Sequence, residues 1–273
     1  MSDSHSRRPW FPFTRRALSG VGRGSVSFFR TIGETVVLAG QMFGFLVRGR
    51  IGWRHTMDQA AFVGVDALGV SMILVTFSAM VIALQVAQEM ARQGAGEYVG
   101  ALVSLAVLRE LAPIMTGVAI TAMAGSAFAA ELSTMRITSQ IDALRTLQMS
   151  PARYLALPRV LASILVTPMM TLMTAIVGIL AGMVISYWLA DVQFLAYLDS
   201  VWRQTSFRDV GAMLIKSSVF GFLIAILSTS IGLNTRGGAK DVGVATTRAV
   251  VWSFLSVAVC DYILTYLIYG SAL

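Results

Sequence analysis

Five stretches of this sequence are apolar over a length that can cross a membrane, and they restrict the fold more than any other feature. A helix rises about 1.5 Å per residue and needs about 20 apolar residues to cross a hydrocarbon core about 30 Å thick. Hydrophobic residues make up 56% of the 273 residues and charged residues only 13%, which is too apolar for a soluble domain. The sequence predicts an all-α polytopic membrane protein with spanning helices at about residues 67–86, 99–130, 160–189, 212–233 and 249–269.

A charged stretch, residues 131–159, separates the second and third spans. Hydrocarbon would not hold these charges at low cost, so the stretch must lie in water: Glu131, Arg136, Asp142, Arg145 and Arg153. Ser150-Pro151 ends the run with turn residues. Four apolar residues at helical spacing predict a short amphipathic helix, pressed on a surface of this protein or of a partner, or lying as a plain connector on the membrane face: Ile137, Ile141, Leu144 and Leu147.

Positive charge is distributed unevenly between the two sides of the predicted spans. Of the 21 lysines and arginines, sixteen fall in residues 1–54, 131–159 and 234–248, and three fall in the loops 88–98 and 191–211. Cytoplasmic loops carry the excess of positive charge, so we expect the N-terminus and the 131–159 loop in the cytoplasm and the C-terminus outside. This distribution explains the net charge of +7 without a nucleic-acid partner.

The N-terminal region precedes the first span and is basic. Residues 1–25 are rich in arginine, serine and glycine, and we expect a disordered cytoplasmic tail there. Asp3 and the short length disfavour an organellar transit peptide. Residues 26–50 are apolar with charges at both ends, which is typical of a helix that lies in the membrane interface. The membrane domain is expected to cover residues 26–273.

Four ionisable residues fall inside the predicted spans. Arg109 and Glu110 interrupt the second, Lys216 lies near the outer start of the fourth, and Asp261 lies near the middle of the fifth. Each charge costs about 2.5 to 3.5 kcal/mol at the bilayer centre, so each needs a partner or a hydrated cavity. Neighbours in sequence point to different helix faces, so Arg109 and Glu110 require partners on other helices. We predict that Glu110 pairs with Lys216 across a central cavity and that a dipole, hydroxyl or cation of a neighbouring segment matches Asp261.

Two interpretations of these charges remain open. They are either buried ion pairs that fix helix packing or the headgroup-contacting lining of a lipid passage. Pro113 should kink the second span and could form a hinge or open a pocket. Four aliphatic residues on the first two spans are candidates for contacts with acyl chains: Leu74, Val81, Leu102 and Leu105.

Catalytic motifs are absent from the sequence. The only lysines, Lys216 and Lys240, do not belong to a G-x-x-x-x-G-K-[ST] phosphate-binding loop, so an ATPase would have to be a separate chain. Cys260 is the single cysteine, and His5 and His55 are in or beside the basic N-terminal region. We therefore predict no catalytic residue, no metal site and no cofactor bound by this chain, and we do not expect an enzyme.

Several separated motifs follow one another in a characteristic order: Leu108-Arg109-Glu110-Leu111-Ala112-Pro113, Ala130-Glu131, Met135-Arg136 with Gln140, Pro158-Arg159, Ile215-Lys216-Ser217, Ala245-Thr246-Thr247-Arg248 and Asp261. With these motifs the chain resembles the MlaE/YrbE family, the permease subunits of ABC systems that move phospholipids or other lipids together with MCE-domain proteins. The likeness covers roughly residues 26 to 270.

The resemblance implies an architecture and a set of partners. Residues 26–50 would form an N-terminal elbow helix, and the 131–159 loop would hold a coupling helix that docks on an ABC ATPase, which uses ATP and Mg. The implied assembly is a homodimer in the bacterial inner membrane, or less readily the plastid inner envelope, with an MCE-domain protein and, in some systems, a STAS-domain protein. The coupling residues would be Glu131, Arg136, Gln140, Ile141, Asp142, Leu144 and Arg145.

A stand-alone, ion-coupled carrier is the alternative. It would use Glu110 and Asp261 as proton sites. Carriers are often built from two inverted repeats, and five spans do not divide into equal halves, which favours the ABC permease. The lipid that is moved and the direction of movement are not determined by the sequence.

Overall fold

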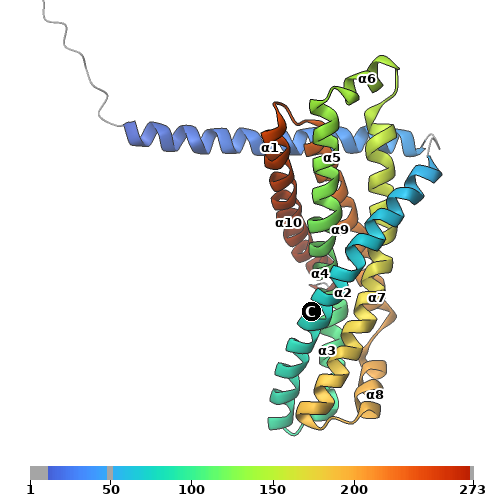
Figure 1. The fold of residues 1–273 in the computed structure, drawn as a ribbon. Helices are drawn as coiled ribbons and strands as arrows, with labels where there is room; N and C mark the ends of the chain where they lie inside the picture. The colour runs from blue at the N-terminus through green and yellow to red at the C-terminus, as the bar shows by residue number, and fades with distance from the viewer. Residues whose placement is uncertain (1–11, 48–51, 271–273) are drawn as a thin grey trace, which may run out of the picture.

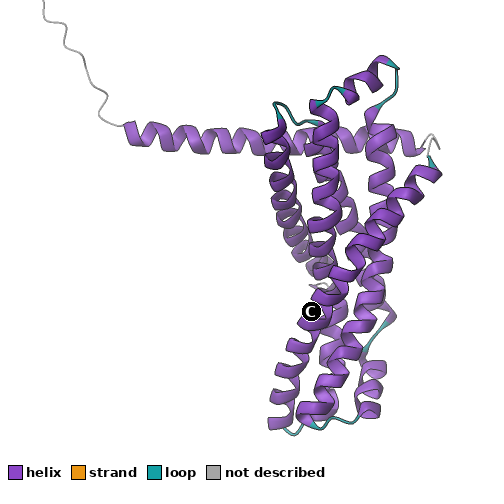
Figure 2. Cartoon of the chain, in the orientation of Figure 1, coloured by secondary structure: helices purple, strands orange, loops and turns teal. Residues whose placement is uncertain are grey.

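The computed structural model describes residues 12–47 and 52–270, and all regular structure within those ranges is helical (Figure 2). Five helical segments are long and apolar enough to cross a membrane, which confirms the predicted all-α polytopic class. Each segment contains one predicted span and extends beyond it at one or both ends. The segments are Trp53–Arg92, Gly96–Ile137, Ala152–Ala190, Phe207–Leu233 and Ala239–Tyr269.

The second and third segments are assembled from several consecutive helical pieces. The second contains a short 3₁₀ turn and two wide π turns between α-helices, in this order: η1 (Gly96–Tyr98), α3 (Val99–Ala106), η2 (Val107–Leu111), α4 (Ala112–Ile120), η3 (Thr121–Gly125) and α5 (Ser126–Ile137). The third begins with a π turn, η4 (Ala152–Ala156), and continues as α7 (Leu157–Ala190). The remaining segments are single helices, α2 (Trp53–Arg92), α9 (Phe207–Leu233) and α10 (Ala239–Tyr269).

Three further helices lie at the ends of the bundle (Figure 1). The long α1 (Pro12–Val47) and the short α6 (Gln140–Thr146) mark one end, and α8 (Phe194–Gln204) marks the other. The C-terminal end of α10 reaches only the middle of the molecule, whereas α2, α3 and α7 continue to the α8 end. Asp261 therefore lies in the C-terminal third of its helix and not near the middle as the sequence-based boundaries placed it, because α10 begins ten residues earlier than expected.

Helix α1 lies across the bundle, nearly perpendicular to the spanning helices (Figure 1). Leu38 and Met42 are buried against the bundle, while Val36, Val37 and Phe43 are exposed, as expected of a helix that lies in a membrane interface. The helix starts at Pro12, so it includes residues 12–25, for which the sequence analysis predicted disorder. Residues 1–11 and 48–51 lie outside the described part of the chain.

A row of small residues brings α2 and α7 into close contact. On α2 every fourth residue from position 63 to position 87 is fully buried: Val63, Ala67, Ser71, Val75, Ala79, Ala83 and Ala87. On α7, Gly178 and Gly182 face this row, and a Cβ atom at either position would lie 2.9 Å from a valine methyl group of Val75 or Val103. Small residues at such spacing let helix backbones approach closely in membranes, and this contact forms the centre of the bundle.

The irregularity expected near Pro113 takes the form of the π turn η2. Proline has no backbone N–H and its ring crowds the carbonyl four residues earlier, which here is Arg109. The chain widens into η2 immediately before Pro113, the second residue of α4. This wide turn carries Arg109 and Glu110, so the proline positions both charged residues.

Helix α8 is held by one buried tyrosine. Tyr197 is fully buried, and its hydroxyl donates a hydrogen bond to the carbonyl of Ile179 at 3.3 Å. Burial raises the pKa of the Tyr197 hydroxyl, so it remains a donor at neutral pH. Gly100 on α3 allows this approach, because a Cβ atom there would lie 2.3 Å from the Tyr197 carbonyl oxygen.

Candidate functional site

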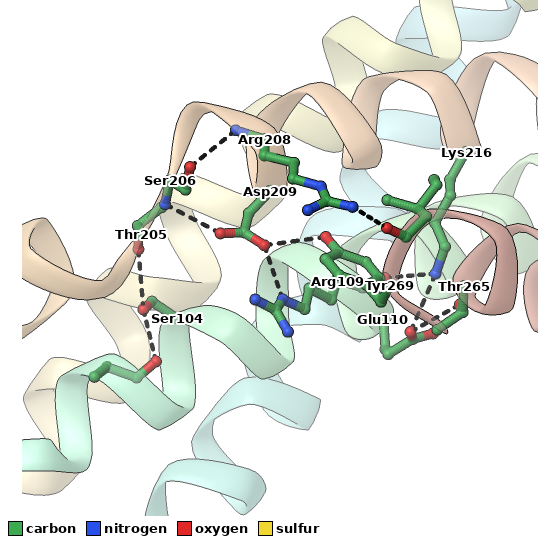
Figure 3. Close-up of polar contacts among 12 residues, drawn as sticks. Ser104, Arg109, Glu110, Thr205, Ser206, Arg208, Asp209, Lys216, Thr265 and Tyr269 are labelled. Atoms are coloured by element: carbon green, nitrogen blue, oxygen red, sulfur yellow. Dashed lines mark hydrogen bonds and ion pairs between the residues drawn. The ribbon is translucent and has the colours of Figure 1, made fainter. Parts of the chain in front are cut away.

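The four charged residues predicted inside the spans lie in two groups near the end of α10. Figure 3 shows three of them, Arg109, Glu110 and Lys216. One group is centred on Lys216 and includes Glu110 and Asp261, and the other joins Arg109 to Asp209. Arg109 and Glu110 therefore bind different partners on other helices, as the sequence indicated. The two groups connect η2 with α9 and α10.

Lys216 is completely buried and is surrounded by three oxygen atoms. Its Nζ lies 3.1 Å from Glu110 Oε1 and 2.8 Å from Asp261 Oδ1. It also donates a hydrogen bond to the carbonyl of Arg109 at 2.8 Å, the carbonyl that Pro113 deprives of its usual helical donor. An ammonium group has three N–H donors, so each of them has an oxygen atom nearby. The pairing of Glu110 with Lys216 is confirmed, and the cation that matches Asp261 is the same lysine.

Two carboxylates thus share one ammonium group. Thr265 of α10 donates a further hydrogen bond to Glu110 Oε1 at 3.1 Å. The Glu110 side chain keeps 39% of its surface exposed, whereas Lys216 has none and Asp261 has 12%. Glu110 is therefore the member of this group that an entering ligand or a proton can reach.

Arg109 is held by a buried aspartate and an aromatic ring. Its Nε donates to Asp209 Oδ1 at 2.8 Å, and its guanidinium carbon lies 4.3 Å from the centroid of the Tyr269 ring. The Tyr269 hydroxyl donates to the same Asp209 oxygen at 3.0 Å. The Arg109 side chain remains 37% exposed, and no described residue forms a hydrogen bond or ion pair with its terminal nitrogens. These nitrogens can therefore bind an anionic group.

Asp209 and Tyr269 were not identified by sequence reasoning. Asp209 falls outside the predicted fourth span, which was placed at residues 212–233, whereas α9 begins at Phe207. The missed signal is the pattern Ser206-Phe-Arg-Asp209, a capping box that marks a helix start. The Ser206 amide donates to Asp209 Oδ2 at 3.0 Å, and the Ser206 hydroxyl accepts from the Arg208 amide at 3.2 Å. The other oxygen of Asp209 stays available for Arg109.

The four aliphatic residues predicted to contact acyl chains lie on α2 and α3. Val81 and Leu102 are exposed, at 53% and 41% of their surface, and Leu74 and Leu105 are partly buried. Their assignment to a lipid pocket remains a prediction.

The 131–159 stretch folds differently from the single amphipathic helix that the spacing predicted. Ile137 ends α5, and Ser139 then adopts a left-handed conformation with φ of 61°, which turns the chain before α6 begins. Leu147 follows α6 and is 69% exposed. Ile141 is fully buried in a cluster with Leu132 and Leu155. The Ile141 side chain therefore anchors α6 on its own chain, one of the two surfaces that the sequence left open, and its part in coupling to an ATPase remains a prediction.

The charged residues of this stretch form two sets of ion pairs. Glu131 pairs with the buried Arg159 at 2.7 Å, which links the middle of α5 to the start of α7. Beyond them Asp142 binds Arg136 at 2.6 Å and Arg145 at 3.4 Å. The predicted coupling residues therefore divide into an anchor at the base of the loop and a polar surface at its tip, where Gln140 is exposed and Leu144 half-buried.

These features define a polytopic α-helical membrane protein with a charged centre inside its bundle and a helical loop that projects from one end. Residues 56–267 match the family model described as Permease MlaE, so the chain belongs to the MlaE permease family. Membership indicates a transport subunit rather than an enzyme.

The relatives include bacterial and chloroplast proteins. A probable ABC transporter permease protein of Synechocystis is 42% identical over 89% of this chain and 92% of its own length. A probable ABC transporter permease protein of Rickettsia felis is 34% identical over 92% of this chain and 97% of its own length. The protein TRIGALACTOSYLDIACYLGLYCEROL 1, chloroplastic, of Arabidopsis thaliana is 38% identical over 86% of this chain and 67% of its own length.

Proposed function

We propose that this chain is the membrane-spanning subunit of an ATP-driven ABC transporter that moves phospholipid or a related lipid between the inner membrane and a periplasmic MCE protein. The observation that carries this proposal is Arg109, a half-exposed guanidinium held by Asp209 within a bundle of apolar helices. A charge inside a membrane is costly unless it is paired or hydrated, and a lipid phosphate is a suitable partner for a guanidinium.

An apolar cavity supports a lipid as the transported molecule. It has a volume of about 430 Å³ and lies between η2, α7, α8 and α9. Its lining includes Leu108, which precedes Arg109, and Ser206 and Phe207 at the start of α9. An apolar cavity of this kind suits the acyl chain of a lipid, and the exposed Arg109 guanidinium on the same helical segment as Leu108 suits an anionic headgroup. The name of the Arabidopsis relative also includes the name of a glycolipid, trigalactosyldiacylglycerol.

The exposed tip of the 131–159 loop supports an ATPase partner. Asp142 and Arg145 are more than half exposed, whereas Ile141 fixes α6 to the bundle, so movement imposed on α6 would be transmitted to α5 and η4. We place this end in the cytoplasm because most lysines and arginines lie there. In this proposal two copies of the chain assemble with two ATPase subunits, which bind ATP and Mg, and with an MCE-domain protein, and in some systems a STAS-domain protein.

Copurification with the ATPase tests the proposal. Arg136→Glu combined with Arg145→Glu should abolish copurification, since both changes reverse charge on the projecting tip. Arg92→Glu combined with Arg203→Glu is the matched control at the α8 end, where both arginines form exposed pairs. The control should copurify as the unmodified chain does. Loss of the ATPase in both double variants, or in neither, would contradict the proposed contact.

A stand-alone carrier is retained as the second candidate because Glu110 and Asp261 share Lys216. Two carboxylates beside one ammonium group can exchange a proton during transport. A carrier should move its substrate in vesicles that contain this chain alone under a proton gradient. The ABC permease should be inactive under that condition.

A further inference from the structure

A polar hollow lies where α1 meets the ends of α9 and α10, at the α6 end of the molecule. Its volume is about 480 Å³. Three arginines, two carboxylates and several small or polar residues line it: Arg30, Thr31, Glu34, Asn234, Thr235, Arg236, Asp241 and Arg248, among others. The hollow is at the level of α1, the helix that we place in the membrane interface.

The charges of this hollow are not balanced within the described residues. Arg30 is neutralised by Glu34, with Nε and Oε1 2.8 Å apart. Asp241 accepts a hydrogen bond from the Gly238 amide at 2.8 Å and so caps the first turn of α10. Arg236 and Arg248 are exposed, and no described residue forms a hydrogen bond or ion pair with either of them. The hollow therefore offers two arginines to an anion.

An apolar hollow adjoins the polar one along α10. Its volume is about 550 Å³, and Lys240, Thr247, Val251 and Trp252 line it. Val244 and Arg248 line both hollows, so the two lie side by side on α10. A free anion or an acidic peptide would not use the apolar part, whereas a lipid with a charged head and an acyl chain would use both.

We propose that this pair of hollows binds an anionic phospholipid, with its phosphate between Arg236 and Arg248 and an acyl chain along Val244 and Val251. Only the assignment of this site to the cytoplasmic leaflet rests on the proposed function. Arg248 and Tyr269 are 21 residues apart on α10, or roughly 30 Å along the helix axis, so this site is separate from Arg109. Basic pockets on the cytoplasmic side of membrane helices recognise anionic headgroups.

Native mass spectrometry of the purified full-length chain tests this site. The chain is equilibrated with equal amounts of phosphatidylglycerol and phosphatidylcholine, and the retained lipids are counted. The unmodified chain should prefer phosphatidylglycerol. Arg236→Gln with Arg248→Gln should lower that preference roughly 25-fold, about fivefold for each arginine near the surface. The two single variants measure each arginine separately if the double variant is poorly folded.

Two further variants distinguish the contribution of the headgroup to lipid retention from that of the acyl chain and from nonspecific effects of charge. Val251→Trp should fill the apolar hollow and reduce retention without changing any charge, and Val251 is 49% exposed, so the helix can accept the larger side chain. Arg92→Gln with Arg203→Gln removes two charges at the opposite end and should leave retention unchanged. Equal retention of both lipids by the unmodified chain, an unchanged preference in the arginine double variant, or undiminished retention by Val251→Trp would overturn the proposal.

Other occupants of the site give distinct results. If Val251→Cys in a Cys260→Ser background forms a disulfide with a second copy in high yield, the second copy covers the apolar hollow and the lipid proposal is wrong. If the arginine double variant keeps its lipid but loses the ATPase, the arginines form a protein contact and the proposal is again wrong. Lipid retention is measured without the ATPase, so its result is independent of the copurification test.

Discussion

The ammonium group of Lys216 lies 2.8 Å from the carboxylate of Asp261, and this contact joins α9 to the C-terminal part of α10. Glu110 approaches the same ammonium group from η2, so one lysine holds three parts of the bundle together. Removing one member of a buried ionic group leaves the others without a partner, which costs more than the net gain of forming the group. We therefore expect that replacing Lys216 destabilises the chain.

Lys216→Met should lower the free energy of unfolding by about 3 to 5 kcal/mol, because Glu110 and Asp261 lose their shared cation. Lys240→Met is the matched control, since Lys240 is exposed, and surface changes usually alter stability by less than about 0.5 kcal/mol. Thermal unfolding in detergent would be measured for both. A Lys216→Met protein that unfolds at the temperature of the control would show that the group is not structurally important.

Asp209→Ala should also destabilise the chain, by about 3 to 5 kcal/mol, because it leaves Arg109 without its carboxylate and removes the partner of the Tyr269 hydroxyl. Asp199→Ala removes an exposed pair with Arg203 on α8 and should cost at most about 1 kcal/mol. The unfolding midpoints of the two variants would be compared under the same conditions. Equal midpoints would contradict a buried role for Asp209.

Gly221→Ala should destabilise the contact between α9 and α7. A Cβ atom at Gly221 would lie 2.5 Å from the carbonyl oxygen of Ser163, and crowding of this kind costs about 1 to 3 kcal/mol. Gly211→Ala on the same helix meets no atom within 4 Å and should be neutral or stabilising by up to about 1 kcal/mol. The two variants make the same substitution on the same helix, so the unfolding temperature should fall for Gly221→Ala and stay the same or rise for Gly211→Ala. An equal fall in both would argue against the close approach.

Ile141→Ala should release α6 from the bundle. The residue is fully buried, and truncation of a buried isoleucine costs about 2 to 5 kcal/mol. Leu147→Ala is the control, because that side chain is 69% exposed. Limited proteolysis should cleave the 131–159 loop much faster in Ile141→Ala than in Leu147→Ala. Equal cleavage rates would show that Ile141 does not anchor the loop.

The sequence predicts the class of fold and the number of spanning helices, because apolar length is a local property that each segment carries by itself. It also predicts that Glu110 pairs with Lys216, since an intramembrane charge needs a partner and few candidates exist. The sequence does not predict that Asp261 joins the same lysine, because this depends on how far α10 extends before Ala249. With ten additional N-terminal residues, Asp261 lies in the C-terminal third of α10 and not near its middle.

The residues that sequence reasoning missed lie at helix ends. Asp209 was assigned to a loop because a hydropathy window cannot include the polar first turn of α9. The single amphipathic helix expected in the 131–159 stretch is divided by Ser139, whose left-handed conformation is not encoded by the periodicity of the apolar residues. Burial of Ile141 then follows from the direction that the turn gives α6, which only the three-dimensional structure provides.

Lipid movement by the reconstituted assembly is the most direct test of an ATP-driven lipid permease. This chain, its ATPase and its MCE partner would be reconstituted in vesicles with a fluorescent phospholipid, and transfer of the lipid would be followed with and without ATP. We expect transfer only with ATP and the ATPase, and loss of transfer when Arg136→Glu and Arg145→Glu are combined. Transfer by this chain alone, driven by a proton gradient without nucleotide, would contradict the proposed function.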